Sequence, residues 1–143
     1  MEKIKISKID RSLYVNYLVR SKECLSAAMH SFGLNQWNAS AISAIHSGIA
    51  SLDALCVYYL GQRHAGQSHE DAITLFRSIK QISRKDIDII VNRIIKILKM
   101  KNMAEYEERL VQQTEAQNIL RDAERLFEAV KNKLPYNGLS QDN

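Results

Sequence analysis

Residues 37–62 read WNASAISAIHSGIASLDALCVYYLGQ, and the fold class follows from the pattern in this segment. Its larger apolar side chains recur at steps of three or four residues, which is the period of an α-helix. They are Ile42, Ile45, Ile49, Leu52, Cys56 and Tyr59. The residues between them are mostly Ala and Ser, whose small side chains let neighbouring helices approach closely. We therefore predict a long helix with other helices packed around it.

The segments on either side of this helix carry the same period. Residues 9–32 have a broad apolar stripe, and Gly33, Leu34 and Asn35 then form a C-terminal stop. Residues 61–67, GQRHAGQ, are read as the clearest loop in the chain. Ser68 is placed to cap a third, shorter helix that extends through about Lys80.

Two further helices are expected in the second half of the chain. Ser83 caps the first, whose isoleucines keep the helical period although their intrinsic propensity favours strands. The second spans residues 114–133, where Thr114 and Gln117 resemble a capping box. Residues 102–113 are assigned to neither loop nor helix. We expect one domain over residues 1–134 and a frayed tail over residues 135–143.

Composition agrees with a helical protein that builds its own core. The 143 residues include only 5 Gly and 1 Pro, so few turns are available, and 45% are hydrophobic. The fold class is predicted to be all-α, an up-and-down bundle of about five helices. Cys24 and Cys56 lie far apart among apolar neighbours, which indicates reduced core thiols.

Charge and hydropathy favour a cytoplasmic protein with no membrane partner. The N-terminus lacks the apolar region of a signal peptide, and no uninterrupted apolar run approaches the roughly 20 residues that span a bilayer. Net charge is +4, which is compatible with an anionic partner. Most of the basic residues between 77 and 101 have no acidic neighbour, so this region is either a solvated or acid-paired face or a phosphate-binding one.

Three segments, in this order, resemble the HEPN superfamily of prokaryotic defence and toxin–antitoxin systems. They are residues 44–55 (AIHSGIASLDAL), 61–72 (GQRHAGQSHEDA) and 101–106 (KNMAEY), the last followed by an acidic, alanine-rich helix. The resemblance spans about residues 13–133 and is closest to short, stand-alone members. It implies a helical homodimer and, in active members, RNA cleavage that needs no metal or cofactor.

Active members of that superfamily carry an arginine, four to six intervening residues and a histidine. The histidine suits removal of the proton from a ribose 2′-OH near neutral pH, and the guanidinium suits a phosphate that gains charge. Arg63 and His69, with five residues between them, satisfy this spacing as a catalytic pair. Their position between the second and third helices departs from the family, whose motif precedes or opens a late helix. The alternative is structural: Arg63 binds carbonyl groups at the end of one helix, and His69 lies in the first turn of the next.

A second match to the motif begins near residue 101. Alignment on Asn102 places Lys101 at the arginine and Tyr106 at the histidine, whereas alignment on the tyrosine places Lys99 and Ala104 there. Both alignments lack the histidine, and tyrosine is a poor base at neutral pH because its ordinary pKa is about 10. We assign Lys99, Lys101, Asn102 and Tyr106 as binding residues, with helix-end hydrogen bonding as the structural alternative for Asn102 and Tyr106.

His46 and Asp53 are the remaining candidates for the binding site. They lie seven residues apart and therefore share one face of the second helix. If that face meets Arg63, His69 or Tyr106, the two side chains complete a polar pocket. The alternative is that His46 is a core histidine whose hydrogen bonds are satisfied within the protein. No histidine pair has metal-ligand spacing with a carboxylate, so no metal site is predicted.

Two functional hypotheses follow, and the sequence leaves both open. The first is a toxin–antitoxin or defence protein that acts on RNA as a metal-independent endoribonuclease. The second is a catalytically inactive binding module, either a partner (antitoxin or toxin) of another protein or a nucleotide binder. The missing late histidine motivates the second hypothesis. His30 and His64 are read as surface or cap residues.

Overall fold

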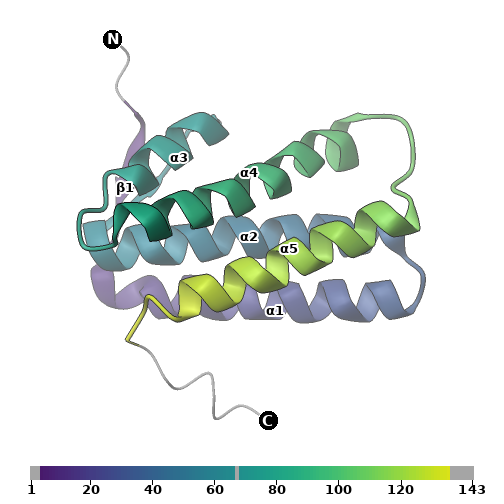
Figure 1. Ribbon diagram of the computed structural model, residues 1–143, viewed down its shortest axis with the longest axis horizontal. Coiled ribbons are helices and arrows are strands. Elements are labelled where there is room, and N and C mark those ends of the chain that lie inside the picture. The colour runs from purple at the N-terminus through teal and green to yellow at the C-terminus, as the bar shows by residue number, and fades with distance from the viewer. Residues whose placement is uncertain (1–3, 67, 136–143) are drawn as a thin grey trace.

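The central element of the structure is helix α2, which spans Trp37–Leu60 and contacts all three of the other long helices. The computed structural model describes residues 4–66 and 68–135. Figure 1 shows the long helices stacked around α2. In chain order the helices are α1 (Tyr14–Gly33), α2, α3 (His69–Arg77), α4 (Arg84–Tyr106) and α5 (Gln113–Lys131), with a single 3₁₀ turn at Arg11–Leu13 before α1.

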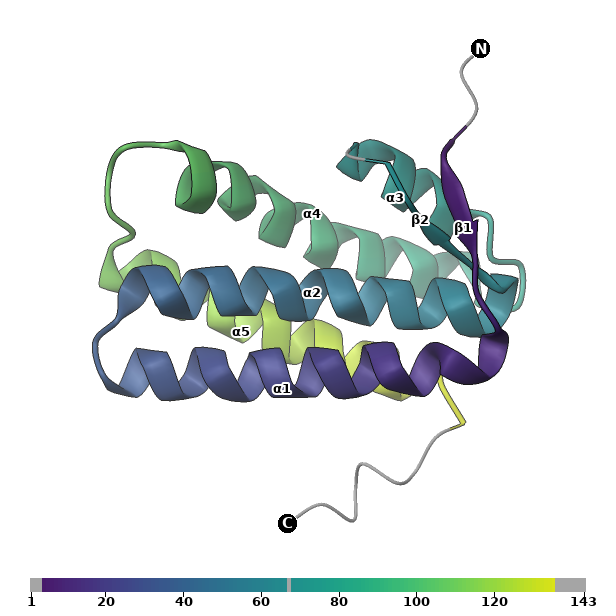
Figure 2. The same cartoon turned by 180° about the vertical axis from the view of Figure 1, so that it is seen from behind.

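The four long helices α1, α2, α4 and α5 run alternately in opposite directions, and α3 lies beside them at one end (Figures 1 and 2). This arrangement confirms the predicted up-and-down bundle of about five helices. The core is formed by buried Ile, Leu, Val, Ala and Phe side chains from all five helices. Cys24 and Cys56 are free thiols, and burial raises the pKa of both.

Helix α2 is long and apolar enough to cross a membrane, with a mean hydropathy of 1.4 over its most apolar window. However, 72% of that window is buried inside the bundle. Ser and Ala residues on α2 allow this burial because they bring the neighbouring helix α1 close: the Ser21 hydroxyl lies 2.8 Å from the Ser47 carbonyl oxygen. The apolar pattern of α2 is therefore matched by its burial in the core of the bundle.

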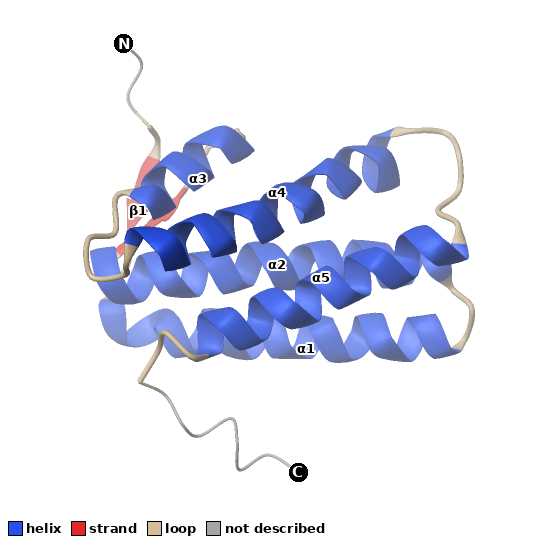
Figure 3. Ribbon diagram, viewed as in Figure 1, coloured by secondary structure: helices blue, strands red, loops and turns tan. Residues whose placement is uncertain are grey.

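A two-stranded antiparallel ribbon is the main departure from the prediction. Strand β1 (Ile6–Lys8) pairs with β2 (Gln62–His64), so part of the segment read as a loop is a strand (Figure 3). Gly61 ends α2 with a left-handed φ of 64°, which turns the chain back towards β1. The alternation Ile4-Lys5-Ile6-Ser7 is the strand signal that the sequence did contain.

The helix ends agree with the predicted caps at two of three positions. The Ser68 and Ser83 hydroxyls accept hydrogen bonds from the backbone N–H groups of Asp71 and Asp86, which confirms both caps. The cap on α5 was predicted wrongly, because Gln112 with Glu115, not Thr114 with Gln117, forms the capping box.

The structure also gives the remaining helix ends. Helix α4 continues to Tyr106, so the unassigned segment is helical at first and connects to α5 through residues 107–112. Helix α3 stops at Arg77, three residues before the predicted end. Most of the predicted frayed tail, residues 136–143, lies outside the described part of the chain.

Candidate active site

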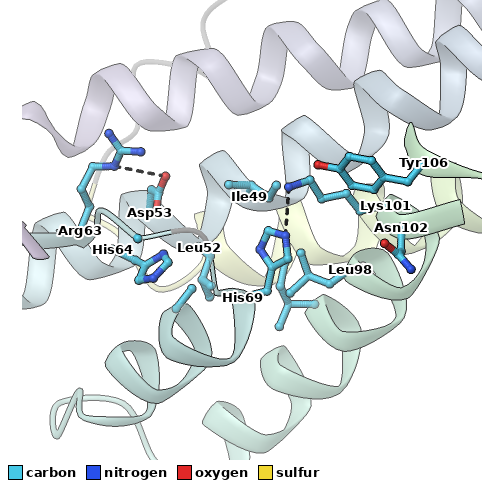
Figure 4. A pocket seen from close by; sticks show the side chains of 13 residues that line it. Ile49, Leu52, Asp53, Arg63, His64, His69, Leu98, Lys101, Asn102 and Tyr106 are labelled. Atoms are coloured by element: carbon cyan, nitrogen blue, oxygen red, sulfur yellow. Dashed lines mark hydrogen bonds and ion pairs between the residues drawn. The ribbon is translucent and has the colours of Figure 1, made fainter. Parts of the chain in front are cut away.

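A cavity of about 700 Å³ lies between α2, β2, α3 and α4. Six of the eight predicted site residues line it: Asp53, Arg63, His69, Lys101, Asn102 and Tyr106. Its apolar wall is formed by Ile49, Leu52, Ala72, Ile94 and Leu98. Polar and cationic groups thus converge on a partly apolar cavity, which is the usual construction of a small-ligand site. Figure 4 shows this cavity from close by.

His69 and Lys101 form the central contact of the cavity. His69 is the first residue of α3 and Lys101 lies in the last part of α4, so two helices position the pair. The Lys101 Nζ atom is 3.0 Å from the Nε2 atom of His69 (Figure 4). Because an ammonium group only donates, Nε2 must accept and the imidazole proton must then reside on Nδ1.

The surroundings of His69 favour its neutral form. Burial is the largest cause that lowers its pKa, followed by the positive charge of Lys101 and the neighbouring His64. Glu105 acts in the opposite direction. A histidine with a lowered pKa is unprotonated at neutral pH and can therefore act as a base.

Arg63 is held by Asp53 and does not touch the His69–Lys101 pair in Figure 4. Its Nε atom is 3.7 Å from Oδ2 of Asp53, which is an ion-pair distance but too long for a hydrogen bond. Accordingly, Arg63 Nε is buried without a hydrogen-bond partner among the described residues. The guanidinium carbon lies 5.7 Å from the centre of the Tyr17 ring, and that of Arg20 lies 5.3 Å from it.

Asp53 has an unusual environment for a carboxylic acid. Its side chain is only 14% exposed, and burial raises its pKa to about 6 even though Arg63 and Arg20 favour the charged form. Asp53 thus contacts Arg63, which is one of the contacts that the sequence predicted for this face of α2. Because the ion pair does not offset the loss of hydration, Asp53 changes charge close to physiological pH.

Two predicted site residues lie outside this cavity lining. His46 is exposed, and its Nε2 atom lies 3.6 Å from Oε1 of Glu105. Lys99 is exposed on α4. His46 lies two helical turns before Asp53, and the cavity touches α2 only from Ile49 to Asp53. Lys99 is two residues from Lys101 and therefore points in a different direction on α4. Of the two alignments near residue 101, the cavity favours the one that uses Lys101 and Tyr106.

His64 is the cavity residue that sequence reasoning missed. It was read as a surface or cap residue, but it lines the cavity from β2, and its Nε2 atom is buried without a hydrogen-bond partner among the described residues. Burial lowers its pKa, Asp71 opposes this effect, and Arg63 adds to it. Recognition of the strand pattern at residues 4–7 would have placed His64 in a paired ribbon instead of a free loop.

Two acidic side chains of α4, Asp86 and Asp88, pair with basic residues from outside that helix. Arg77 donates to Asp88 at 2.9 Å, and Lys133 near the end of the chain pairs with Asp86. Within residues 4–66 and 68–135, no group of three or more His, Cys, Asp or Glu side chains is arranged to hold a metal ion. The polar side chains that line the cavity carry imidazole, ammonium, guanidinium, carboxyl, amide and phenol groups.

Comparison with known proteins gives one family match. The model of the HEPN domain matches residues 14–133, from the first residue of α1 to just beyond the end of α5. The matched range contains every residue of the cavity lining. No curated protein matches the sequence.

Proposed function

Because this chain belongs to the HEPN domain family, we propose that its cavity is the active site of a metal-independent endoribonuclease. The observation that carries the proposal is the contact between the His69 imidazole and the Lys101 ammonium group inside a cavity that Arg63 also lines. A base and two cations are the groups that this reaction needs. The apolar wall, with Ile49 and Leu98, offers a surface for the ribose and base.

The proposed reaction begins when a phosphate group enters between the cations. Lys101 turns from His69 to a non-bridging phosphate oxygen, and this movement frees Nε2 of the imidazole. Neutral His69 then removes the proton of the 2′-OH, and the 2′-oxygen attacks the neighbouring phosphorus. Arg63, already partly desolvated beside Asp53, is placed to stabilise the charge that develops on phosphate. The products are a 2′,3′-cyclic phosphate and a free 5′-hydroxyl.

Cleavage of total RNA by purified protein in excess EDTA tests the proposal. We expect cyclic phosphate ends with the wild type and a loss of about 10²- to 10⁴-fold in rate with His69→Ala. Lys101→Ala should be impaired and Lys101→Arg should retain activity, because arginine also supplies a cation. His30→Ala, at an exposed histidine of α1, is the matched control. Equal cleavage by wild type and His69→Ala would contradict the assignment.

A second function, a catalytically inactive binding module, is favoured by one observation. The Nε2 atom that should receive the proton is already engaged by Lys101, and Arg63 is already paired with Asp53. A cavity of about 700 Å³ also has room for a nucleotide. Binding of RNA or a mononucleotide without any cleavage, or co-purification with the product of a neighbouring gene, would favour this function.

The proposal extends to assembly and biological role. We propose a cytoplasmic homodimer that belongs to a toxin–antitoxin or defence module. Support comes from exposed apolar side chains at the end of α4 and in the segment that follows it, Tyr106 at 71% and Leu110 at 74% exposure. Light scattering should give a dimer for the wild type and a monomer for Leu110→Glu. Expression should slow growth of a host cell, and His69→Ala should relieve that effect.

A further inference from the structure

The proposed cleavage requires two proton transfers, and His69 accounts for only one of them. As the 2′-oxygen bonds to phosphorus, the bond from phosphorus to the 5′-oxygen breaks, and this leaving oxygen must gain a proton. A general acid on the opposite side of the phosphate would supply it. The inference below rests on the proposed ribonuclease function and names the group that performs this second transfer.

We infer that His64 is the general acid that protonates the leaving 5′-oxygen. His64 and His69 line the same cavity from different elements, strand β2 and the start of α3. In the view of Figure 4, His64 lies below Asp53 and to one side of His69, and Lys101 lies to the other side of His69. Two imidazoles on one cavity can serve opposite ends of a phosphodiester.

The unpartnered Nε2 atom of His64 is the second observation. Buried polar side-chain atoms are nearly always hydrogen-bonded, so an exception at a cavity indicates a group that is completed by a ligand. Within the described residues Nε2 of His64 has no partner, whereas Nε2 of His69 is engaged by Lys101. The Nε2 atoms of the two histidines therefore differ: that of His69 has a partner, whereas that of His64 lies beside Gly66 with none among the described residues.

Burial is the largest influence on both rings and lowers the pKa of each, but the next-largest influence differs in sign. Asp71 on α3 favours the protonated form of His64, although burial and Arg63 oppose it. Lys101 on α4 favours the neutral form of His69, and Glu105 opposes that effect. When two neighbouring titratable groups have different environments, their pKa values differ, and one can act as the acid while the other acts as the base. After burial, the largest influence on His64 is therefore a carboxylate, and the largest influence on His69 is an ammonium group.

The complete step balances in protons. His69 Nε2 takes the 2′-OH proton, the 2′-oxygen forms a bond to phosphorus, and the bond to the 5′-oxygen breaks. His64 Nε2 gives its proton to that oxygen, so His64 ends neutral and His69 ends protonated. Exchange with water then restores both rings. No oxidant, reductant or metal takes part.

A substrate with sulphur in place of the leaving 5′-oxygen tests this role. A thiolate leaves without protonation far more readily than an alkoxide, because the pKa of a thiol is much lower than that of an alcohol. We expect His64→Ala and His64→Gln to cleave the oxygen substrate about 10²- to 10⁴-fold more slowly than the wild type. Both should recover to within about tenfold of the wild type on the sulphur substrate, whereas His69→Ala should stay slow on both.

Gly66→Ala is a second, independent variant. A Cβ atom at Gly66 would lie 3.1 Å from His64 Nε2, so this change displaces or covers the atom while it keeps the imidazole. We expect the same recovery with sulphur. His30→Ala serves as the control, and thermal unfolding checks that each variant is folded.

The outcomes separate failure of the inference from failure of the proposed function. If the wild type cleaves RNA and His64→Ala is equally active, His64 is not the acid. If His64→Ala is slowed to the same extent on both substrates, its role is structural and the inference is also overturned. If the wild type cleaves neither substrate, the ribonuclease proposal itself fails, and the inference fails with it.

Discussion

Asp53 shows how the environment of one residue couples the cavity to pH. Burial raises its pKa to about 6, above the value of about 3.9 in an unfolded chain. The folded protein therefore binds more protons at this group than the unfolded chain does between pH 4 and pH 6. Folding stability from Asp53 is highest below about pH 4 and is lost as the pH rises through 6. His64 and His69 act in the opposite direction, because their pKa values are lowered.

The first prediction separates the contribution of Asp53 to the pH dependence of stability from that of the two histidines. The free energy of unfolding of Asp53→Asn minus that of the wild type should grow by about 1–3 kcal/mol between pH 4 and pH 7. Asparagine does not titrate, whereas the buried carboxyl must ionise over this range. Urea unfolding at pH 4, 5, 6 and 7 measures the difference. A difference that is constant with pH would show that Asp53 titrates normally.

At the scale of the element, Gly48 determines how closely α2 approaches α4. A Cβ atom placed there would lie 3.0 Å from Cδ1 and 3.1 Å from Cγ2 of Ile97, and 3.6 Å from Ile94. These isoleucines are fully buried, so they have little freedom to move away. The glycine is therefore retained inside a helix in spite of its poor helix propensity.

The second prediction follows from this contact. Gly48→Ala should lower the free energy of unfolding by about 1–2 kcal/mol, because overpacking outweighs the gain of about 1 kcal/mol in helix propensity. Ile97→Val in the same chain should reduce the loss, since it removes the closer methyl group. Gly33→Ala is the matched control, because nothing lies within 4 Å of its added carbon. A stabilised Gly48→Ala would mean that Ile97 can shift.

The interface between α1 and α2 contains a buried serine cluster. The Ser21 hydroxyl donates to the Ser47 carbonyl oxygen at 2.8 Å and lies 2.6 Å from the Ser51 hydroxyl, and the Ser47 hydroxyl donates to the Ser21 carbonyl oxygen at 2.9 Å. All three side chains are fully buried. Every member thus depends on another for its hydrogen bonds.

The third prediction is that Ser21→Ala destabilises the protein by about 1–3 kcal/mol, because it leaves a buried hydroxyl on Ser51 without this partner. Ser26→Ala, at an exposed position of α1, should change the free energy of unfolding by less than about 0.5 kcal/mol. Denaturant unfolding of both variants makes the comparison. Equal effects would show that the cluster contributes nothing specific.

At the scale of the whole molecule, the net charge is +4, which favours an anionic partner. Lys101 and Arg63 face the cavity, and further lysines and arginines lie along α4. Binding of a single-stranded nucleic acid to such a surface releases counterions, so affinity falls as salt rises. This behaviour distinguishes phosphate contacts from a face that is only solvated.

The fourth prediction concerns this salt dependence. The logarithm of the RNA-binding constant should fall linearly with the logarithm of salt concentration, and Lys101→Ala should reduce the slope by about 0.7. Lys133→Ala, whose ammonium group pairs with Asp86, should leave the slope unchanged. Fluorescence anisotropy with a short labelled RNA, on the His69→Ala background, measures both. An unchanged slope for Lys101→Ala would remove it from the phosphate contacts.

The sequence by itself determined the helices and their approximate ends. The apolar period of α2, the serine caps at Ser68 and Ser83, and the scarcity of Gly and Pro are local features, so they can be read without knowledge of the rest of the chain. It also indicated six residues that line the cavity: motif spacing selected five of them, and a shared helix face selected Asp53.

Only the tertiary structure decided which of those residues meet. Lys101 lies 32 residues from His69, and β1 pairs with a strand some 56 residues away, so no local pattern records either contact. His46 was misplaced and His64 overlooked for the same reason. The side chains that meet depend on the angle and depth at which two helices cross, and core packing sets both. At Gly48, for example, the absence of a side chain lets α2 lie directly against Ile97 of α4, which is 49 residues further along the chain.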